Sequence, residues 1–150
     1  MSTNTIEKRI EIKASRARVW RALTNHTEFS EWFGAALTTP FAVGQVSAGV
    51  IKTERWGDID WKATVQKLEP ESYFALTWHP FSVDKTADYS KETPTLVEFR
   101  LQDIPGGTLL TVRESGFDQI PAQRRRQAFD SHTEGWAAQL RNIQEHVEKA

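Results

Sequence analysis

The sequence contains no cysteine in its 150 residues, so disulfide bonds, thiolate metal sites and cysteine nucleophiles are all excluded. Long hydrophobic runs are missing too, because no stretch approaches the roughly 18 apolar residues of a membrane span. The first residues, MSTNTIEKRIEIK, lack the apolar region of a signal peptide. These absences predict a cytoplasmic protein with no membrane partner.

Neither sign of charge is in excess. Nineteen Lys and Arg stand against 20 Asp and Glu, which gives a formal net charge of -1 at pH 7. A nucleic-acid-binding protein needs a basic face that releases counterions from phosphates, so this balance argues against a nucleic-acid partner. His26, His79 and His146 show no metal-ligand spacing such as His-Glu-x-x-His, and we expect no metal site and no cofactor.

Aromatic residues are what the sequence has in surplus, with six Trp and eight Phe. The remaining composition, 39% apolar and 26% charged, is typical of one globular domain, and we predict a single domain over residues 1–150. A chain of this length buries roughly 68–70% of its unfolded surface, which is enough for a substantial core. Aromatic side chains line either such a core or a ligand cavity, so their surplus is the first indication of function.

The first third of the chain predicts one strand followed by two short helices. Ile6, Ile10 and Ile12 share one alternating phase, which predicts a half-buried strand over residues 6–12. Ser15 is a suitable N-cap for a helix over residues 16–24, and Gly34 would end a second helix over residues 27–33. The strands expected after these helices cover residues 36–39, 45–51, 61–68, 73–78, 95–102 and 108–115, and residues 56–60 are among the predicted breaks.

A long helix is predicted from Pro121 to about residue 149. Its apolar stripe consists of Phe129, Trp136, Leu140, Ile143 and Val147, and His132 falls in the one gap of that stripe. About 28 residues make a helix roughly 42 Å long, enough to cross a whole sheet. Because the strand connections are short, we expect antiparallel neighbours. The predicted fold class is α+β: a curved seven-stranded antiparallel sheet wrapped on a long C-terminal helix, with two short helices after the first strand.

A single helix does not fill the concave face of such a sheet, so the sequence predicts a ligand cavity between them. The walls of this cavity are the inward-facing phases of the strands and the apolar stripe of the helix. Glu114 continues one strand phase, and His132 lies in the helix stripe. The predicted ligand-binding residues are Trp61, Val65, Phe74, Leu76, Trp78, Phe99, Leu110, Val112, Glu114, Phe129, His132 and Trp136.

The order of elements matches the helix-grip fold of the START-like (SRPBCC) superfamily, and local blocks resemble one family within it. That family is the activator of heat-shock-protein ATPase homologue (AHSA)-like family. The resemblance implies a helix-grip fold and a carrier, cyclase, resistance or co-chaperone role, but no shared catalytic motif. Loops 52–60 and 79–94 depart from the family's pattern. The resembling blocks are VWRALTNHTEFSEWF (19–33), PFAVGQV (40–46), LEPESYFALTW (68–78), PGGTLLTVRESGF (105–117) and GWAAQLRNI (135–143).

The polar and tryptophan residues of the predicted site are weighed between a functional and a structural interpretation. His132 is either an acid, base or hydrogen-bond donor aimed into the cavity, or, the interpretation we favour, a helix histidine satisfied by a strand carbonyl or hydroxyl. Glu114 stands near a strand end, where a solvated carboxylate is ordinary, so we assign it no catalytic role. Trp61, Trp78 and Trp136 either stack on a planar ligand or pack against one another.

Three functions follow from these observations. The leading hypothesis is a protein that binds a small hydrophobic ligand, aromatic, lipid-like or polyketide-like, in the predicted cavity. The first alternative is a cyclase-type or hydrolase-type enzyme acting on such a ligand, but without a catalytic motif we favour non-enzymatic binding. The second alternative is a co-chaperone-like interaction with a heat-shock-protein ATPase. A symmetric homodimer is the default expectation for a soluble oligomer.

Overall fold

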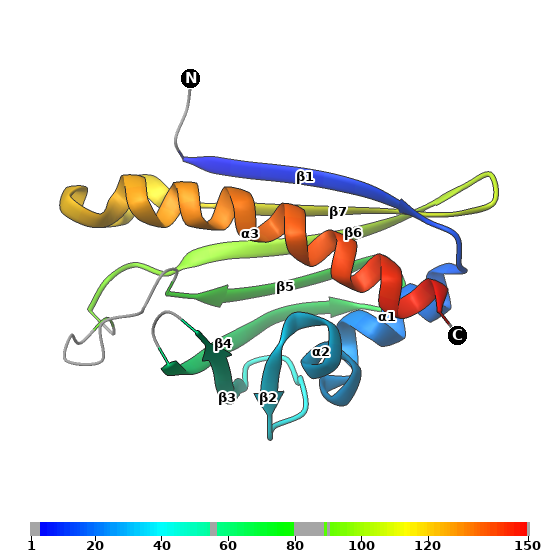
Figure 1. The fold of residues 1–150 in the computed structure, drawn as a ribbon, viewed down its shortest axis with the longest axis horizontal. Helices are drawn as coiled ribbons and strands as arrows, with labels where there is room; N and C mark the ends of the chain where they lie inside the picture. The colour runs from blue at the N-terminus through cyan, green and yellow to red at the C-terminus, as the bar shows by residue number, and fades with distance from the viewer. Residues whose placement is uncertain (1–3, 55–56, 80–88, 90, 150) are drawn as a thin grey trace.

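The computed structural model describes residues 4–54, 57–79, 89 and 91–149. One seven-stranded antiparallel sheet has the order β1-β7-β6-β5-β4-β3-β2, and the long helix α3 crosses its concave face (Figure 1). This arrangement confirms the predicted α+β helix-grip fold. The elements are β1 (Thr5–Ile12), α1 (Arg16–Thr24), α2 (His26–Phe33), β2 (Ala35–Leu37), β3 (Val46–Thr53), β4 (Gly57–Glu69), β5 (Tyr73–Trp78), β6 (Thr95–Ile104), β7 (Gly107–Ser115), the 3-10 turn η1 (Phe117–Gln119) and α3 (Ala122–Glu148).

Capping residues set the ends of the two short helices. The Ser15 side chain accepts a hydrogen bond from the Arg18 backbone N–H at the start of α1. Asn25 ends α1 and begins α2, where its side chain accepts from the Glu28 backbone N–H. Gly34 adopts a left-handed conformation with φ of 85°, which favours glycine and turns the chain from α2 into β2. These contacts confirm the helix ends predicted at Ser15 and Gly34.

The predicted break over residues 56–60 is wrong for the last four of them. Strand β4 begins at Gly57, which pairs with Thr53 of β3 in a tight hairpin. The Thr53 hydroxyl donates to the Gly57 carbonyl at 2.9 Å and closes that hairpin. Asp58 and Asp60 have low strand propensity, but pairing with β3 overrides it. Trp56, at the start of the predicted break, lies outside the described residues.

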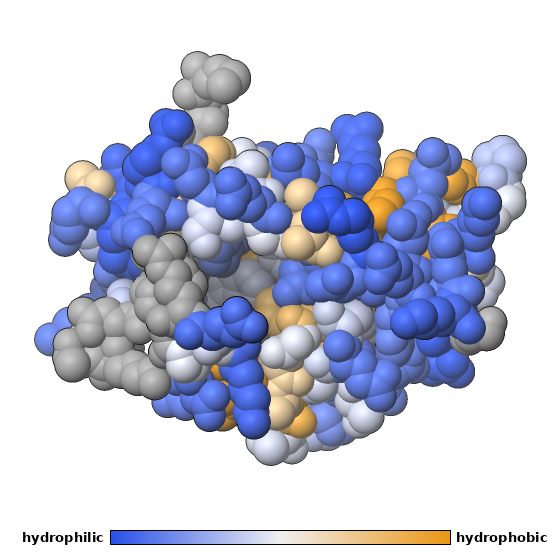
Figure 2. Space-filling model, viewed as in Figure 1, coloured by the Kyte–Doolittle hydropathy of each residue, from blue (hydrophilic) through white to orange (hydrophobic). Residues whose placement is uncertain are grey.

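The core lies between the sheet and the helices. The predicted inward phases of the strands are confirmed, because their residues are buried on the face of the sheet that the helices cover. None of the helices in the described ranges has the length and apolar character needed to cross a bilayer. On the face viewed in Figure 2 the surface along α3 is mostly hydrophilic, and apolar residues gather over β2. The inner-face residues, none more than 8% exposed, are Trp61, Ala63, Val65, Phe74, Leu76, Trp78, Val97, Phe99, Leu101, Leu110 and Val112.

Candidate functional site

Glu114 is a fully buried carboxylate on the inner face of β7. Its exposed fraction is 0%, so the prediction of a solvated carboxylate at this position is wrong. Strand β7 lies inside the sheet, and Glu114 pairs with Ile6 of β1 on one side and Val97 of β6 on the other. Residues of α3 cover the same face. The end of a strand is exposed when no other strand pairs with it and no element covers it. Here β7 is paired on both sides and covered by α3, so Glu114 is buried.

Four donors surround the Glu114 carboxylate. Its Oε1 accepts from Trp136 Nε1 at 2.8 Å and from His132 Nδ1 at 2.6 Å. Its Oε2 accepts from Trp78 Nε1 at 2.8 Å and from Thr95 Oγ1 at 2.5 Å. The donors come from β5, β6 and α3, so the cluster joins the sheet to the helix. An ionised carboxylate offers about four lone-pair sites, and here each oxygen accepts two bonds.

The cluster keeps Glu114 ionised. Burial raises the pKa of the Glu114 carboxyl, but the charge of His132 and hydrogen bonds from His132, Thr95 and Trp78 lower it, so that the net pKa lies below its ordinary value. At neutral pH the protein therefore holds an anion in its interior. Three of its four donors are uncharged, so His132 is the side chain in the cluster that can balance this charge.

The contact with Glu114 fixes the tautomer of His132. Because the ionised carboxylate only accepts hydrogen bonds, His132 Nδ1 must carry a proton. Nε2 is then the nitrogen that gains or loses a proton, and it makes no hydrogen bond to any residue in the described part of the chain. The sequence favoured a strand carbonyl or hydroxyl as the partner of His132. That prediction is wrong, because the partner on the strand is a carboxylate.

The three tryptophans of the predicted site pack in a row. Trp78 stacks on Trp136 with ring centroids 5.6 Å apart, and Trp61 meets Trp78 edge-on at 5.8 Å. The ring of Phe33, at the end of α2, lies 5.9 Å from both Trp61 and Trp78. Of the two interpretations left open by the sequence, the structure shows the rings in contact with one another. Stacking on a ligand and the predicted cavity remain predictions.

Trp61 differs from the other tryptophans in its indole N–H. Trp78 and Trp136 donate to Glu114, and Trp32 donates to the Ala22 carbonyl at 2.8 Å. Trp61 is 5% exposed, and its Nε1 has no hydrogen-bond partner within the described residues. An unpaired buried donor costs about 1–3 kcal/mol, so an acceptor brought to this position would gain most of that energy.

The other predicted site residues divide into two groups. Six of them form the apolar floor of the sheet, and Phe129 stands apart from this floor because it is only half-buried and its ring packs on Phe117 at 5.3 Å. The loop over 79–94, which departs from the family's pattern, lies largely outside the described residues. The floor residues, each at most 1% exposed, are Val65, Phe74, Leu76, Phe99, Leu110 and Val112.

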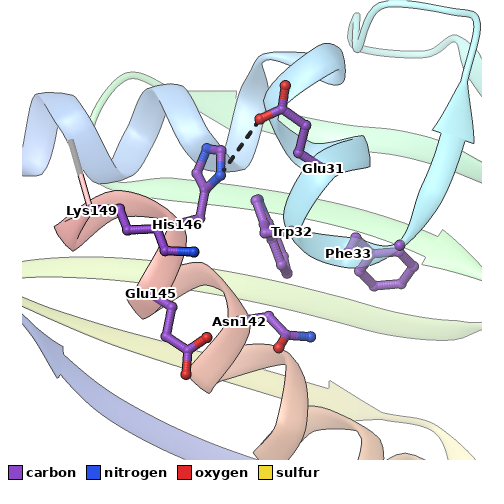
Figure 3. Close-up of a pocket in the computed structure, with 8 residues that line it drawn as sticks. Glu31, Trp32, Phe33, Asn142, Glu145, His146 and Lys149 are labelled. Atoms are coloured by element: carbon purple, nitrogen blue, oxygen red, sulfur yellow. Dashed lines mark ion pairs between the residues drawn. The ribbon is translucent and has the colours of Figure 1, made fainter.

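A groove between the end of α2 and the last turns of α3 lies on the other side of Phe33 (Figure 3). Its volume is about 640 Å³. The His146 side chain faces Glu31 across it, at 3.7 Å between Nδ1 and Oε2. His146 Nε2 also contacts Glu28 Oε1 at 2.8 Å, 118 positions away in sequence, and no spacing pattern signals that pair. The lining residues are Glu31, Trp32, Phe33, Gly34, Asn142, Glu145, His146 and Lys149.

Solved structures share this fold. Protein MLL2253 from Mesorhizobium loti is 24% identical, with a TM-score of 0.76, and the match covers 97% of this chain and 98% of that one. The Aha1 dimer from Colwellia psychrerythraea is 21% identical, with a TM-score of 0.70 and 96% of each chain covered. DynU16, a protein in the dynemicin biosynthetic locus, is 19% identical with a TM-score of 0.69, and the match covers 97% of this chain but 47% of DynU16.

Sequence comparison gives the family. No curated protein matches this sequence at a significant level. Residues 13–148 match the family described as Activator of Hsp90 ATPase homolog 1-like protein. The match spans all three helices and all strands except β1, so the chain belongs to the Activator of Hsp90 ATPase homolog 1-like family, within the START-like superfamily.

Proposed function

We propose that this protein binds a small, neutral, fused-ring aromatic molecule between the inner face of the sheet and α3. The observation that carries the proposal is the buried indole N–H of Trp61, which has no partner within the described residues. Natural proteins satisfy nearly all buried donors, so an unpaired one needs an explanation. A carbonyl or ether oxygen of a bound ligand supplies the missing acceptor.

The surroundings of Trp61 favour an aromatic ligand. Rings of Phe29, Phe33 and Trp78 lie within 6 Å of the Trp61 ring centroid. Aromatic rings stack in offset or edge-on geometry and gain energy beyond their buried area. Burying about 200 Å² of apolar ligand surface contributes roughly 5 kcal/mol before the cost of association is subtracted. The site therefore supplies affinity through rings and orientation through one donor.

Phe33 links this interior to the surface groove. Its half-buried ring contacts Trp61 and Trp78. Phe33 is also one of the residues that line the groove (Figure 3). It also lies 6.5 Å from Trp136, so it occupies the place where the three indoles meet. We therefore assign Phe33 as the side chain that a ligand displaces when it enters from the groove.

A binding measurement with two probes tests the proposal. 2-Acetylnaphthalene carries a ring system and one acceptor oxygen, and 2-ethylnaphthalene has the same rings without the oxygen. One neutral hydrogen bond contributes about 0.5–1.5 kcal/mol, so calorimetry should show roughly twofold to tenfold tighter binding of the ketone. Trp61→Phe should abolish this preference, and the control Trp20→Phe, which removes an indole outside the site, should keep it.

Two results would contradict this proposal. One is a protein that binds neither naphthalene. The other is a preference for the ketone that survives in Trp61→Phe, because the donor would then lie elsewhere. Native mass spectrometry of protein purified from its own host, followed by denaturation, identifies the natural ligand. A bound molecule without an aromatic ring would replace the proposed ligand class.

The relatives add coarse support for this proposal and for a partner. DynU16, which shares the fold, lies in a biosynthetic locus, and this supports a small molecule as the ligand. The Colwellia relative is described as a dimer, and this supports a homodimer here. Light scattering of the purified protein should then give twice the chain mass of 17.1 kDa. A mass of one chain at micromolar concentration would contradict the homodimer.

A further inference from the structure

The two edges of the seven-stranded sheet are finished differently. At one edge β2 is only three residues long, and the Leu37 backbone N–H donates to the Ser30 hydroxyl of α2, with N and O 3.0 Å apart. At the other edge β1 runs for eight residues, and in the described part of the chain no strand lies beyond it (Figure 1). An open edge of this length presents unpaired backbone groups to a strand of another chain. β1 is therefore the edge at which a partner strand can be added.

The backbone groups of β1 alternate between β7 and the open side. The Glu11 carbonyl points to the open side, where it accepts from Gln144 Nε2 of α3 at 2.9 Å. Successive residues of an antiparallel strand turn their N–H and C=O to opposite sides, so Glu7 and Arg9 share the outward phase of Glu11. Among the residues that the structure describes, none bonds to the backbone N–H or C=O of Glu7 or Arg9 on that side. These groups are therefore free to pair with another strand.

The side chains of β1 form two different faces. Glu7 and Arg9 lie on the outer face, 44% and 64% exposed, with Arg9 Nη2 3.2 Å from Glu7 Oε2. Ile6, Lys8 and Ile10 take the opposite phase and lie on the face that α3 covers. One acidic and one basic side chain thus stand two positions apart on the outer face. Reversing the strand exchanges their places, so a second copy of β1 is complementary in charge to the first.

We propose that β1 pairs antiparallel with β1 of a second copy of this chain, about a two-fold axis that passes beside Lys8. This inference rests on the homodimer proposed above and names its interface. Glu7 lies opposite Arg9 of the partner subunit, and each such pair exchanges both of its backbone hydrogen bonds. On the inner face Ile6 lies opposite Ile10 of the partner subunit. The two sheets become one continuous sheet, and the interface uses the same strand of both copies, as a two-fold axis requires.

Charge selects this register over its neighbours. An axis moved by one residue to Glu7 places Glu7 opposite itself, and an axis at Arg9 places Arg9 opposite itself and Glu7 opposite Glu11. Like charges directly opposite each other destabilise a strand pair. The axis at Lys8 has one like pair, the two Lys8 side chains, whose long stems carry the ammonium groups apart into solvent. It is the register of these three in which both outer-face pairs are of opposite charge.

Charge reversal followed by mixing tests the interface, with light scattering over a range of protein concentrations as the measurement. Arg9→Glu makes both facing pairs acidic and Glu7→Arg makes both basic, so each variant alone should dimerise at least about tenfold more weakly. Mixed in equal amounts, the two variants should form a heterodimer, because a carboxylate then faces a guanidinium in both pairs. The control Lys62→Glu reverses an exposed charge on β4 and should dimerise like the intact protein.

The outcomes separate this interface from the homodimer itself. If the intact protein has the mass of one chain, the homodimer fails and this inference fails with it. If the dimer survives both reversals, the homodimer stands and pairing through β1 is overturned. Weakened variants that mixing does not rescue overturn the register. Lys8→Thr, which removes the like pair at the axis, should strengthen the dimer, and a dimer that it leaves unchanged or weakens also overturns the register.

Discussion

The long helix α3 presents two histidines to two buried or half-buried carboxylates, and the two pairs differ in what surrounds them. His132 contacts Glu114 under the sheet, and His146, fourteen positions later, contacts Glu28 of α2. Glu28 also receives Arg18 at 2.7 Å and Arg21 at 2.8 Å, and its side chain is 18% exposed. Glu114 receives no guanidinium from the described residues and is 0% exposed.

The two pairs differ in how the charge of the carboxylate is balanced. Two arginines already neutralise Glu28, so His146 adds a third contact to a network that ties α1, α2 and α3 together. Glu114 has only neutral donors besides His132, so its charge acts mainly on that one ring. In a low-dielectric interior an interaction of this kind is stronger than at the surface. The same pair of residue types therefore adds to an arginine network at one end of α3 and holds a buried anion at the other.

The largest effect should come from removing the charge of Glu114, with Glu28 as the matched comparison. Glu114→Gln leaves donors facing an amide in a dry interior, and breaking a buried pair of this type costs about 3–5 kcal/mol of unfolding free energy. Glu28→Gln should cost about 1 kcal/mol or less, because solvent reaches it and exposed pairs contribute little. Urea unfolding of both variants measures the two losses. Equal losses would remove the distinction between the two pairs.

Acid should act mainly through the same residue. The pKa of Glu114 is lower in the folded protein than the ordinary value of 4.5, so its contribution to stability is complete above that value and is lost as pH falls through the folded pKa. The urea midpoint of the intact protein should therefore drop steeply below pH 4.5. Glu28 has a lowered pKa as well: burial raises it, but hydrogen bonds from His146 and Arg18 and the charge of Arg18 lower it further. The variant Glu28→Gln should keep most of the drop. A flat profile in that variant would assign the acid sensitivity to Glu28 instead.

A pair of tryptophan variants isolates the hydrogen bond to the buried anion. Trp78→Phe and Trp61→Phe remove the same volume from adjacent rings, but only Trp78 donates to Glu114. A hydrogen bond to a charged group contributes about 1.5–3 kcal/mol, so Trp78→Phe should destabilise the protein by roughly 2 kcal/mol more than Trp61→Phe. Calorimetric unfolding of both variants gives the difference. A larger loss in Trp61→Phe would mean that its indole N–H has a partner.

The sequence predicted more of the fold than of the site. The alternation of side chains along each strand correctly predicted that Trp61, Trp78 and Val112 lie on the inner face, because this alternation does not depend on neighbouring strands. The same alternation placed Glu114 on that face, but its burial depends on β1, β6 and α3, which pair with or cover β7 in three dimensions. Local propensity argued for solvent at a strand end, and tertiary structure reversed it.

The partners of the two histidines could not be predicted from the sequence for a related reason. Glu114 and His132 are 18 positions apart, and Glu28 and His146 are 118 apart, and in each pair the two residues lie on different elements, so no periodicity within one element relates them. Only the crossing of α3 over the sheet and past α2 brings them into contact. A lone histidine in an apolar stripe signals that a polar partner exists, because buried polar groups are nearly always bonded. It does not signal whether that partner is a carbonyl, a hydroxyl or a carboxylate.

The smallest expected effect also distinguishes the interior site from the surface groove. His146→Gln removes one of three contacts to Glu28 and should cost less than about 1 kcal/mol, while His132→Gln leaves a buried anion short of its charged donor and should cost about 1–3 kcal/mol.

His146 lines the groove, so a ligand that rested there would bind His146→Gln more weakly. Because we place the ligand among the indoles, the affinity for 2-acetylnaphthalene should stay unchanged in His146→Gln. Phe33→Ala, which removes the ring between groove and interior, should raise that affinity about fivefold, since the ligand no longer displaces a packed side chain. Calorimetric titration of both variants would place the ligand in the groove if His146→Gln weakened binding and Phe33→Ala had no effect.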